Sequence, residues 1–208
     1  MPGRHRGREN NAENAANRLA ARADLRSEKI AARMALPAAT HLRLSAELEA
    51  HLRPLLQRWL PPIIGYCWPI RGEFDCRPLV IDLLKQGVRA CLPLVLAAGS
   101  AMKFREWKPE SPMRVDRYGI QHPASGAILV PDLLLIPVNA FDRRGYRLGY
   151  GGGYFDRTLA ALDPRPLAVG VGFELARVAS TLPGAHDIAL DAVVTEAGAS
   201  LFSSRLAL

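Results

Sequence analysis

Short, nearly continuous apolar segments recur along the chain, and they restrict its possible folds more than any other feature. Leu133–Val138 is the clearest example, because it is almost wholly apolar. Strands of this kind are typical of a mostly parallel sheet that helices cover on both faces, whereas half-exposed strands alternate apolar and polar residues. The expected strands are Ile63–Trp68, Ala90–Val95, Ala101–Phe104, Leu133–Val138, Leu167–Phe173 and Ala192–Thr195.

Helix-forming segments alternate with these strands. The segment from Ala15 to Ala35 is rich in Ala, Arg and Leu, which favour helices, and Pro37 would stop it. The alternation predicts an α/β fold with three layers, in which a mostly parallel sheet has helices on both faces, preceded by an N-terminal helical segment. The expected helices are residues 15–35, 41–59, 77–86 and 154–162.

The chain of 208 residues is long enough for one substantial domain. Residues 1–14 are polar and rich in Arg and Asn, so we expect a disordered basic tail there. Residues 15–208 should then form a single α/β domain. Residues 105–127 mix Pro, Gly and charged residues, which predicts a long loop.

The net charge of +7 is unevenly distributed along the chain. Residues 1–60 hold 11 basic and 6 acidic residues, whereas residues 61–208 hold 16 and 14. Nucleic-acid binding is one interpretation of a basic N-terminal region. Because no aromatic residues are interleaved there for base stacking, we favour a solvated arm that supplies phosphate ligands, and we expect no nucleic-acid partner.

The sequence favours a location in the cytoplasm. Residues 1–20 have no central apolar run and include Glu9 and Glu13, which argues against a signal peptide. Cys67, Cys76 and Cys91 do not have the spacing of a metal site, and an odd number of cysteines does not form a complete set of disulfides. We therefore expect free thiols in a reducing cytoplasm. The apolar stretches are too short to cross a bilayer, and no membrane partner is expected.

A glycine-rich segment follows the strand Leu133–Val138. Four glycines fall within Gly149–Gly153, directly before the predicted helix at Tyr154. Glycine permits close backbone approach, and a helix N-terminus offers free N–H groups, so the segment suits a phosphate. A tight turn without any ligand is the alternative. The segment lacks the Gly-Lys-Ser/Thr of a Walker loop and the glycine spacing of a dinucleotide fold.

The same region resembles a known family. Leu129–Val138 followed by Phe141–Arg157 is similar to the signature of the 5-formyltetrahydrofolate cyclo-ligases, in which a strand ending in Pro precedes Phe-Asp, a Gly and Arg-Leu-Gly-Tyr-Gly-Gly-Gly-Tyr-Tyr-Asp-Arg. Weaker similarity extends over residues 22–196. Arg22–Arg26 resembles the N-terminal Lys-x-x-Leu-Arg of the family, and Asp187–Glu196 resembles its C-terminal motif.

The resemblance implies a fold of the sugar-isomerase and CoA-transferase type and an enzyme that uses ATP, Mg²⁺ and a reduced folate. It implies that Trp68 and Glu73 contact the folate, that Asp156 and Asp191 serve the metal, and that no side chain acts as a catalytic nucleophile. Taken without the resemblance, Asp156 would be a helix N-terminal charge and Asp191 a turn residue. The ATP-binding residues that it implies are Arg22, Arg26, Arg147, Leu148, Gly149, Tyr150, Gly151, Gly152, Gly153, Tyr154 and Phe155.

The implied activity is the ATP-dependent closure of 5-formyltetrahydrofolate to 5,10-methenyltetrahydrofolate, through phosphorylation of the formyl oxygen. We expect a monomer or weak homodimer. Two alternatives stay open at this point. A sugar-phosphate isomerase would also need a phosphate loop, and a non-catalytic RNA-binding relative would use the basic N-terminus.

Overall fold

The computed structural model describes residues 4–206, with side chains from Asn14 onward. Its centre is an eight-stranded sheet in the order β12-β11-β10-β7-β1-β2-β3-β6. The five strands from β11 to β2 in this order are parallel. β12 and β3 run antiparallel to them at the two sides, and β6 pairs with β3 in antiparallel fashion. The strands are β1 Ile63–Gly65, β2 Arg89–Leu94, β3 Lys103–Trp107, β6 Ile128–Leu129, β7 Leu133–Pro137, β10 Leu167–Val171, β11 Ala192–Thr195 and β12 Gly198–Leu201.

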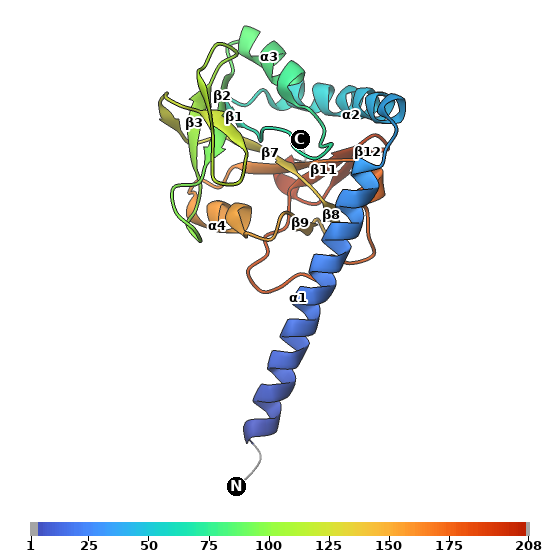
Figure 1. The fold of residues 1–208 in the computed structure, drawn as a ribbon. Helices are drawn as coiled ribbons and strands as arrows, with labels where there is room; N and C mark the ends of the chain where they lie inside the picture. Colours follow the sequence, from blue (N-terminus) through green and yellow to red (C-terminus); the bar gives the residue numbers. More distant parts are fainter. Residues whose placement is uncertain (1–3, 207–208) are drawn as a thin grey trace.

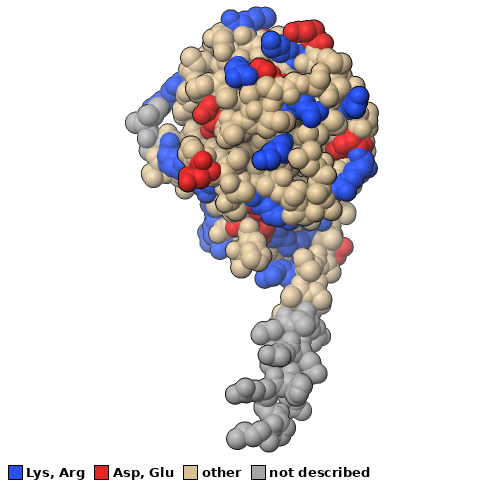
Figure 2. All heavy atoms as spheres, turned by 90° about the vertical axis from the view of Figure 1, so that its left-hand side faces the viewer, with Lys and Arg blue, Asp and Glu red and all other residues tan. Residues whose placement is uncertain are grey.

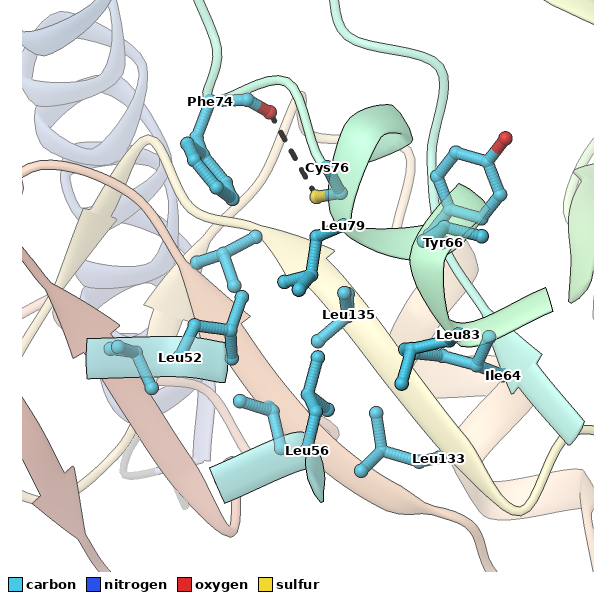
Figure 3. Close-up of a cluster of buried hydrophobic side chains, with 14 of the residues drawn as sticks. Leu52, Leu56, Ile64, Tyr66, Phe74, Cys76, Leu79, Leu83, Leu133 and Leu135 are labelled. Carbon is cyan, nitrogen blue, oxygen red and sulfur yellow. Dashed lines mark hydrogen bonds between the residues drawn. The ribbon is translucent and has the colours of Figure 1, made fainter. Parts of the chain in front are cut away.

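Helices cover both faces of this sheet, which confirms the predicted three layers (Figure 1). On one face, α2 (Ala38–Trp59) and α3 (Arg77–Lys85) pack their leucines against β7, β10 and β11. Figure 3 shows Leu52 and Leu56 of α2 facing Leu133 and Leu135 of β7. On the other face, α4 (Tyr154–Ala161) inserts Leu159. Because each parallel strand is buried on both faces, its sequence is almost continuously apolar.

The C-terminal part of helix α1 (Arg4–Met34) packs against β8 (Ala140–Phe141) and the short 3-10 helix Glu174–Ala176, and its N-terminal part projects from the body (Figure 1). The helix begins at Arg4, before the predicted start at Ala15. Residues 4–14 hold one Ala against three Asn and a Gly, so composition alone does not predict these first turns. The disordered tail over residues 1–14 stays a prediction, since residues 1–3 and the side chains of residues 4–13 lie outside the described part.

The loop predicted over residues 105–127 is partly wrong. β3 continues to Trp107, and a hairpin of β4 (Met113–Val115) and β5 (Gln121–Pro123) follows it. β3 places Phe104 and Trp107 in the core and leaves Arg105 and Glu106 partly exposed. A strand near the side of the sheet lacks a continuous apolar run, and so the pattern that identifies the central strands does not identify it.

The charged side chains on the face in Figure 2 are scattered among uncharged surface, and basic and acidic groups lie near one another. That face therefore offers no continuous basic stripe of the kind a nucleic-acid backbone requires. Within residues 4–206, none of the helices is both long enough and apolar enough to span a bilayer.

Candidate active site

A cavity of about 730 Å³ opens at the carboxyl ends of the parallel strands. Pro137 at the end of β7, Trp68 after β1 and Pro93 near the end of β2 form part of its wall. The glycine-rich segment forms another part, and α1 contributes Arg22 and Arg26. This position is where open α/β sheets bind their ligands, because the loops after the strands diverge there.

The glycine-rich segment is held between a small hairpin and a helix. β8 (Ala140–Phe141) and β9 (Arg147–Leu148) pair in antiparallel fashion, and α4 begins directly after Gly153. Gly151 has φ +93° and Gly153, at the N-cap of α4, has φ +64°. A Cβ atom at Gly153 would also lie 2.8 Å from the Arg157 Nη1 atom. Side chains at these positions would strain the backbone, so the turn requires glycine.

Two buried or half-buried arginines flank this loop. Arg26 of α1 donates from Nε to the Gly149 carbonyl at 2.6 Å, and burial together with the neighbouring Arg22 lowers its pKa. Arg147 donates to the Ile188 carbonyl at 2.8 Å and to Asp156 Oδ1 at 3.1 Å, and burial lowers its pKa. Both cations are fixed in direction before any ligand binds. Such preorganised donors suit an anion.

Arg22 lies about one turn before Arg26 on the same helix. It forms a two-pronged pair with Asp187, with Nη1–Oδ2 at 2.8 Å and Nη2–Oδ1 at 3.2 Å, and it donates to the carbonyls of Thr181 and Leu182. An arginine has the fork geometry for this pair and a lysine does not. Arg22 therefore attaches α1 to the segment before β11 and lies at the mouth of the cavity.

Another part of the cavity wall, formed by Trp68 and Glu73, is aromatic and acidic. The Arg77 guanidinium lies 4.4 Å from the centre of the Trp68 ring and is itself paired with Asp75 at 2.7 Å. This cation–π contact covers part of the indole while Trp68 still lines the cavity. Glu73 accepts from the Ile70 N–H at 3.0 Å. An aromatic surface beside a buried carboxylate suits a flat, nitrogen-rich ring.

Glu73 belongs to a buried network that reaches the glycine loop. The Tyr150 hydroxyl donates to Glu73 Oε1 at 2.7 Å, and Arg33 Nη2 donates to the same hydroxyl at 3.2 Å. Burial raises the pKa of Glu73, although the hydrogen bond from Tyr150 and the positive charges of Arg33 and Arg71 oppose this effect. The two ends of the cavity therefore share one hydrogen-bonded connection.

Asp156 and Asp191 do not lie together, so the expectation that they converge on one metal is wrong. Asp191 is 1% exposed and accepts from the Ala168 N–H at 2.9 Å and from Arg205 at 3.2 Å. Ala168 lies at the amino end of β10, so Asp191 is at the opposite edge of the sheet from the cavity. Arg165 and Arg205 balance its charge. No cluster of three or more potential metal ligands of the His, Cys, Asp or Glu type occurs among the residues that the structure describes.

Asp156 is the carboxylate whose position suits a metal that accompanies a phosphate. It lines the cavity, and its Oδ1 atom accepts both from Arg147 and from the Ile188 N–H at 3.0 Å. Since both bonds are made at Oδ1, the second oxygen of this carboxylate could meet a cation that a phosphate ligand carries. A single carboxylate is sufficient for Mg²⁺, which usually keeps several waters and takes its other ligands from phosphates.

The structure brings together most of the site residues that the sequence predicts. Leu148 is an exception, because its side chain is fully buried and its carbonyl accepts from the Asn139 N–H at 2.9 Å. The predicted residues that line the cavity are Arg22, Arg26, Trp68, Glu73, Arg147, Gly149, Tyr150, Gly151, Gly152, Gly153, Tyr154, Phe155 and Asp156.

Sequence reasoning missed two groups at the site. Arg33 follows Arg26 by two helical turns, so the spacing of Arg22, Arg26 and Arg33 on one helical face was an available signal. Asp116, Tyr118 and Ile120 reach the cavity from the turn between β4 and β5. The Tyr118 hydroxyl lies 2.6 Å from that of Tyr154. This second group depends on a hairpin that the apolar pattern did not predict.

The fold and the cavity define an α/β enzyme with a glycine-rich loop at the carboxyl ends of its parallel strands. Comparison with known proteins supports this class and makes it specific. The model of the 5-formyltetrahydrofolate cyclo-ligase family matches residues 18–196. The chain belongs to this family.

Relatives from several bacteria agree with this assignment. The 5-formyltetrahydrofolate cyclo-ligase of Escherichia coli is 35% identical over 132 residues, which cover 60% of this chain and 72% of the relative. That of Haemophilus influenzae is 27% identical over 169 residues, covering 78% and 90%. The structure of the Aquifex aeolicus 5,10-methenyltetrahydrofolate synthetase matches with a TM-score of 0.75 at 30% identity, covering 87% of this chain and 92% of that one.

Proposed function

We propose that this enzyme closes 5-formyltetrahydrofolate to 5,10-methenyltetrahydrofolate and converts ATP to ADP and phosphate in the same cycle. The observation that carries the proposal is one continuous cavity of about 730 Å³ whose wall includes both a cationic glycine loop and an aromatic, acidic surface. A reaction between a nucleotide and a flat heterocycle needs both surfaces in one space, so that the two reactants meet.

The glycine loop is the nucleotide end. Backbone N–H groups at the start of α4 and the positive end of its dipole would face the phosphates. Arg22, Arg26 and Arg147 supply positive charge around them, and the fixed positions of their guanidinium groups lower the cost of organising the site. Gly151 and Gly153 allow the backbone to come close to the phosphates.

The folate end is the surface of Trp68 and Glu73. The indole of Trp68 would stack on the pterin, while Arg77 keeps the indole plane in place. The Glu73 carboxylate would accept hydrogen bonds from pterin nitrogens, because pterins present N–H donors along one edge. A buried carboxylate discriminates well, since an unmatched partner leaves it unpaired.

The chemistry needs positioning more than a protein nucleophile. The formyl oxygen attacks the γ-phosphoryl group, ADP leaves, and the formyl carbon becomes an iminium phosphate. N10 then forms a bond to that carbon and loses its proton, and the C–O bond breaks to release phosphate. Arg26 and Arg147 would stabilise the charge that develops on the transferred group, and the cavity walls would limit hydrolysis by water.

Magnesium fits at Asp156 together with the phosphates of ATP. When bound there, it would neutralise phosphate charge. Asp191 has no part in this assignment, because it lies at the other edge of the sheet.

Spectroscopy of the purified protein tests the proposal. With 5-formyltetrahydrofolate, ATP and Mg²⁺, the absorbance of the methenyl product should appear in step with ADP. Omission of ATP should leave the folate unchanged. Failure to form the product by a folded protein that binds both ligands would contradict the proposal, as would ADP formation that does not depend on the folate.

A further inference from the structure

Arg33 is a buried cation behind the cavity wall. It lies in the last turn of α1 and is 5% exposed. Its guanidinium donates from Nε to the Arg71 carbonyl at 3.0 Å, from Nη1 to Asn139 Oδ1 at 2.9 Å and from Nη2 to the Tyr150 hydroxyl at 3.2 Å. Arg33 is not one of the residues that form the cavity wall.

These three bonds join three separate parts of the site. Arg71 precedes Glu73 on the folate side, Asn139 follows β7, and Tyr150 belongs to the glycine loop. The Tyr150 hydroxyl has one hydrogen. Because Arg33 donates to its oxygen, that hydrogen is directed to Glu73 Oε1 at 2.7 Å. Arg33 Nη2 itself lies 3.9 Å from Glu73 Oε1 and contributes charge more than a direct bond.

Stability gives little reason for a cation at this position. A helix end can be anchored by apolar packing, and well-packed apolar residues often replace buried ion pairs without loss of stability. The guanidinium has three directed donors that reach both ends of the cavity, which an apolar anchor could not provide. Its geometry is therefore better explained by the site than by the attachment of α1.

We propose that Arg33 is a positioning residue that couples the two ends of the site: through Tyr150 it fixes Glu73 on the folate side and the first turn of the glycine loop on the nucleotide side. The inference rests on the proposed function, because it assigns Glu73 to the folate. The substrates touch Tyr150 and Glu73, and Arg33 acts through them.

A double-mutant cycle on folate affinity tests this coupling. Arg33→Met should weaken binding of 5-formyltetrahydrofolate about tenfold in the native background, the loss expected for one charged hydrogen-bond partner. In a Glu73→Gln background, the same change should weaken binding less than about threefold, since interacting residues are not additive. Equal losses in both backgrounds would show that Arg33 acts independently of Glu73, and the proposal would be wrong.

Two further variants separate positioning from folding. Both Arg33→Met and Arg33→Lys should lower kcat, because both lose the fork of donors. Arg33→Lys keeps the charge, so the folate affinity should recover in part. Arg43→Met removes an arginine from an exposed pair with Glu47 on α2 and should leave both constants unchanged. If Arg33→Met and Arg33→Lys lower only the melting temperature and leave both constants of the folded protein at native values, Arg33 is structural.

A ligand-free measurement decides the inference even if the substrate assignment fails. The carboxyl carbon of Glu73 can be followed by ¹³C NMR during a pH titration. The groups that face it are Arg33, Arg71, Tyr150, Cys67 and Cys76. Arg33→Met should raise the pKa of Glu73 because it removes a positive charge and releases Tyr150. An unchanged titration would overturn the proposal, whereas a native enzyme that does not bind the folate would overturn the proposed function instead.

Discussion

Gly151 is the residue at which backbone geometry and ligand access are most closely linked. Its φ of +93° and its position on the cavity wall both require the absence of a side chain. Gly151→Val should abolish ATP binding measured by calorimetry, while 5-formyltetrahydrofolate still binds. β-branched residues tolerate positive φ poorly, and the side chain would occupy the space of a phosphate.

Gly87 offers a matched control for this variant. Its φ is +90° and a Cβ atom there would meet nothing within 4 Å. Gly87→Val should therefore produce similar backbone strain and leave ATP binding intact. Loss of ATP binding in both variants would mean that strain, rather than access, explains the result.

The raised pKa of Glu73 should give pH opposite effects on folate affinity and on the free energy of unfolding. Because burial raises its pKa above the ordinary value of 4.5, the folded state binds this proton more tightly than the unfolded state. The free energy of unfolding should rise as the pH falls through the raised pKa. Folate affinity should decrease over the same range, since the carboxylate proposed to accept from the pterin is lost.

Glu73→Gln should remove both pH dependences, which isothermal titrations and thermal melts at several pH values would reveal. The facing groups Arg33, Arg71 and Tyr150 stay in place in this variant. If the native affinity is flat in pH, Glu73 does not bind the folate as a carboxylate.

The two aspartates that the sequence grouped together should now behave differently. Asp156→Asn should retain ATP binding but shift the Mg²⁺ dependence of turnover, because it keeps the shape and removes a charge at the cavity. Asp191→Asn should lower the melting temperature, since the pairs with Arg165 and Arg205 lose their charge. A changed Mg²⁺ optimum in Asp191→Asn would contradict this division.

At the scale of elements, the central strands could be predicted, whereas only the start of β3 could be predicted among the lateral ones. Leu133–Pro137 and Ala192–Thr195 are apolar at nearly every position because helices cover both of their faces. β3, β4 and β5 carry Arg, Glu, Gln and His, and their pairing depends on neighbours far away in the sequence. β12 likewise alternates intermediate and exposed residues.

The glycine loop could also be predicted from local sequence, because its backbone conformation requires glycine and the glycines are visible in the sequence. The residue type of Asp191 did not reveal that it lies away from the cavity. Its position directly before β11 puts it at the amino end of that strand, whereas the cavity opens at the carboxyl ends. Arg33 lay on the same helical face as Arg22 and Arg26. Its role is identified by its hydrogen bonds to Asn139 and Tyr150, which only the folded structure shows.

Helix α1 should be divisible into a part that the site uses and a part that it does not. Deletion of residues 1–14 should leave the Michaelis constant for ATP nearly unchanged, because Arg22 and Arg26 remain. Deletion of residues 1–27 should raise this constant strongly, since both arginines are lost along with the bonds to Asp187 and Gly149. Circular dichroism would verify folding, and a folded, fully active longer truncation would exclude α1 from the nucleotide end.

At the scale of the whole molecule, each ligand should stabilise the folded chain separately. A ligand at about 100 times its Kd adds about 2.7 kcal/mol to the free energy of unfolding. For a chain of this size, that corresponds to a rise in Tm of roughly 5–10 °C. ATP and 5-formyltetrahydrofolate together should give a larger rise than either gives singly, and Gly151→Val should lose only the part due to ATP.

The contacts of α1 also have a consequence for biosynthesis. Arg22 binds Asp187, and Arg26 binds the carbonyl of Gly149, so the first helix completes the nucleotide end with partners that the ribosome makes much later. A nascent chain would leave these arginines without their partners until most of the sheet had emerged. ATP turnover would then begin only when synthesis is nearly finished, and an abandoned translation product would not consume the nucleotide.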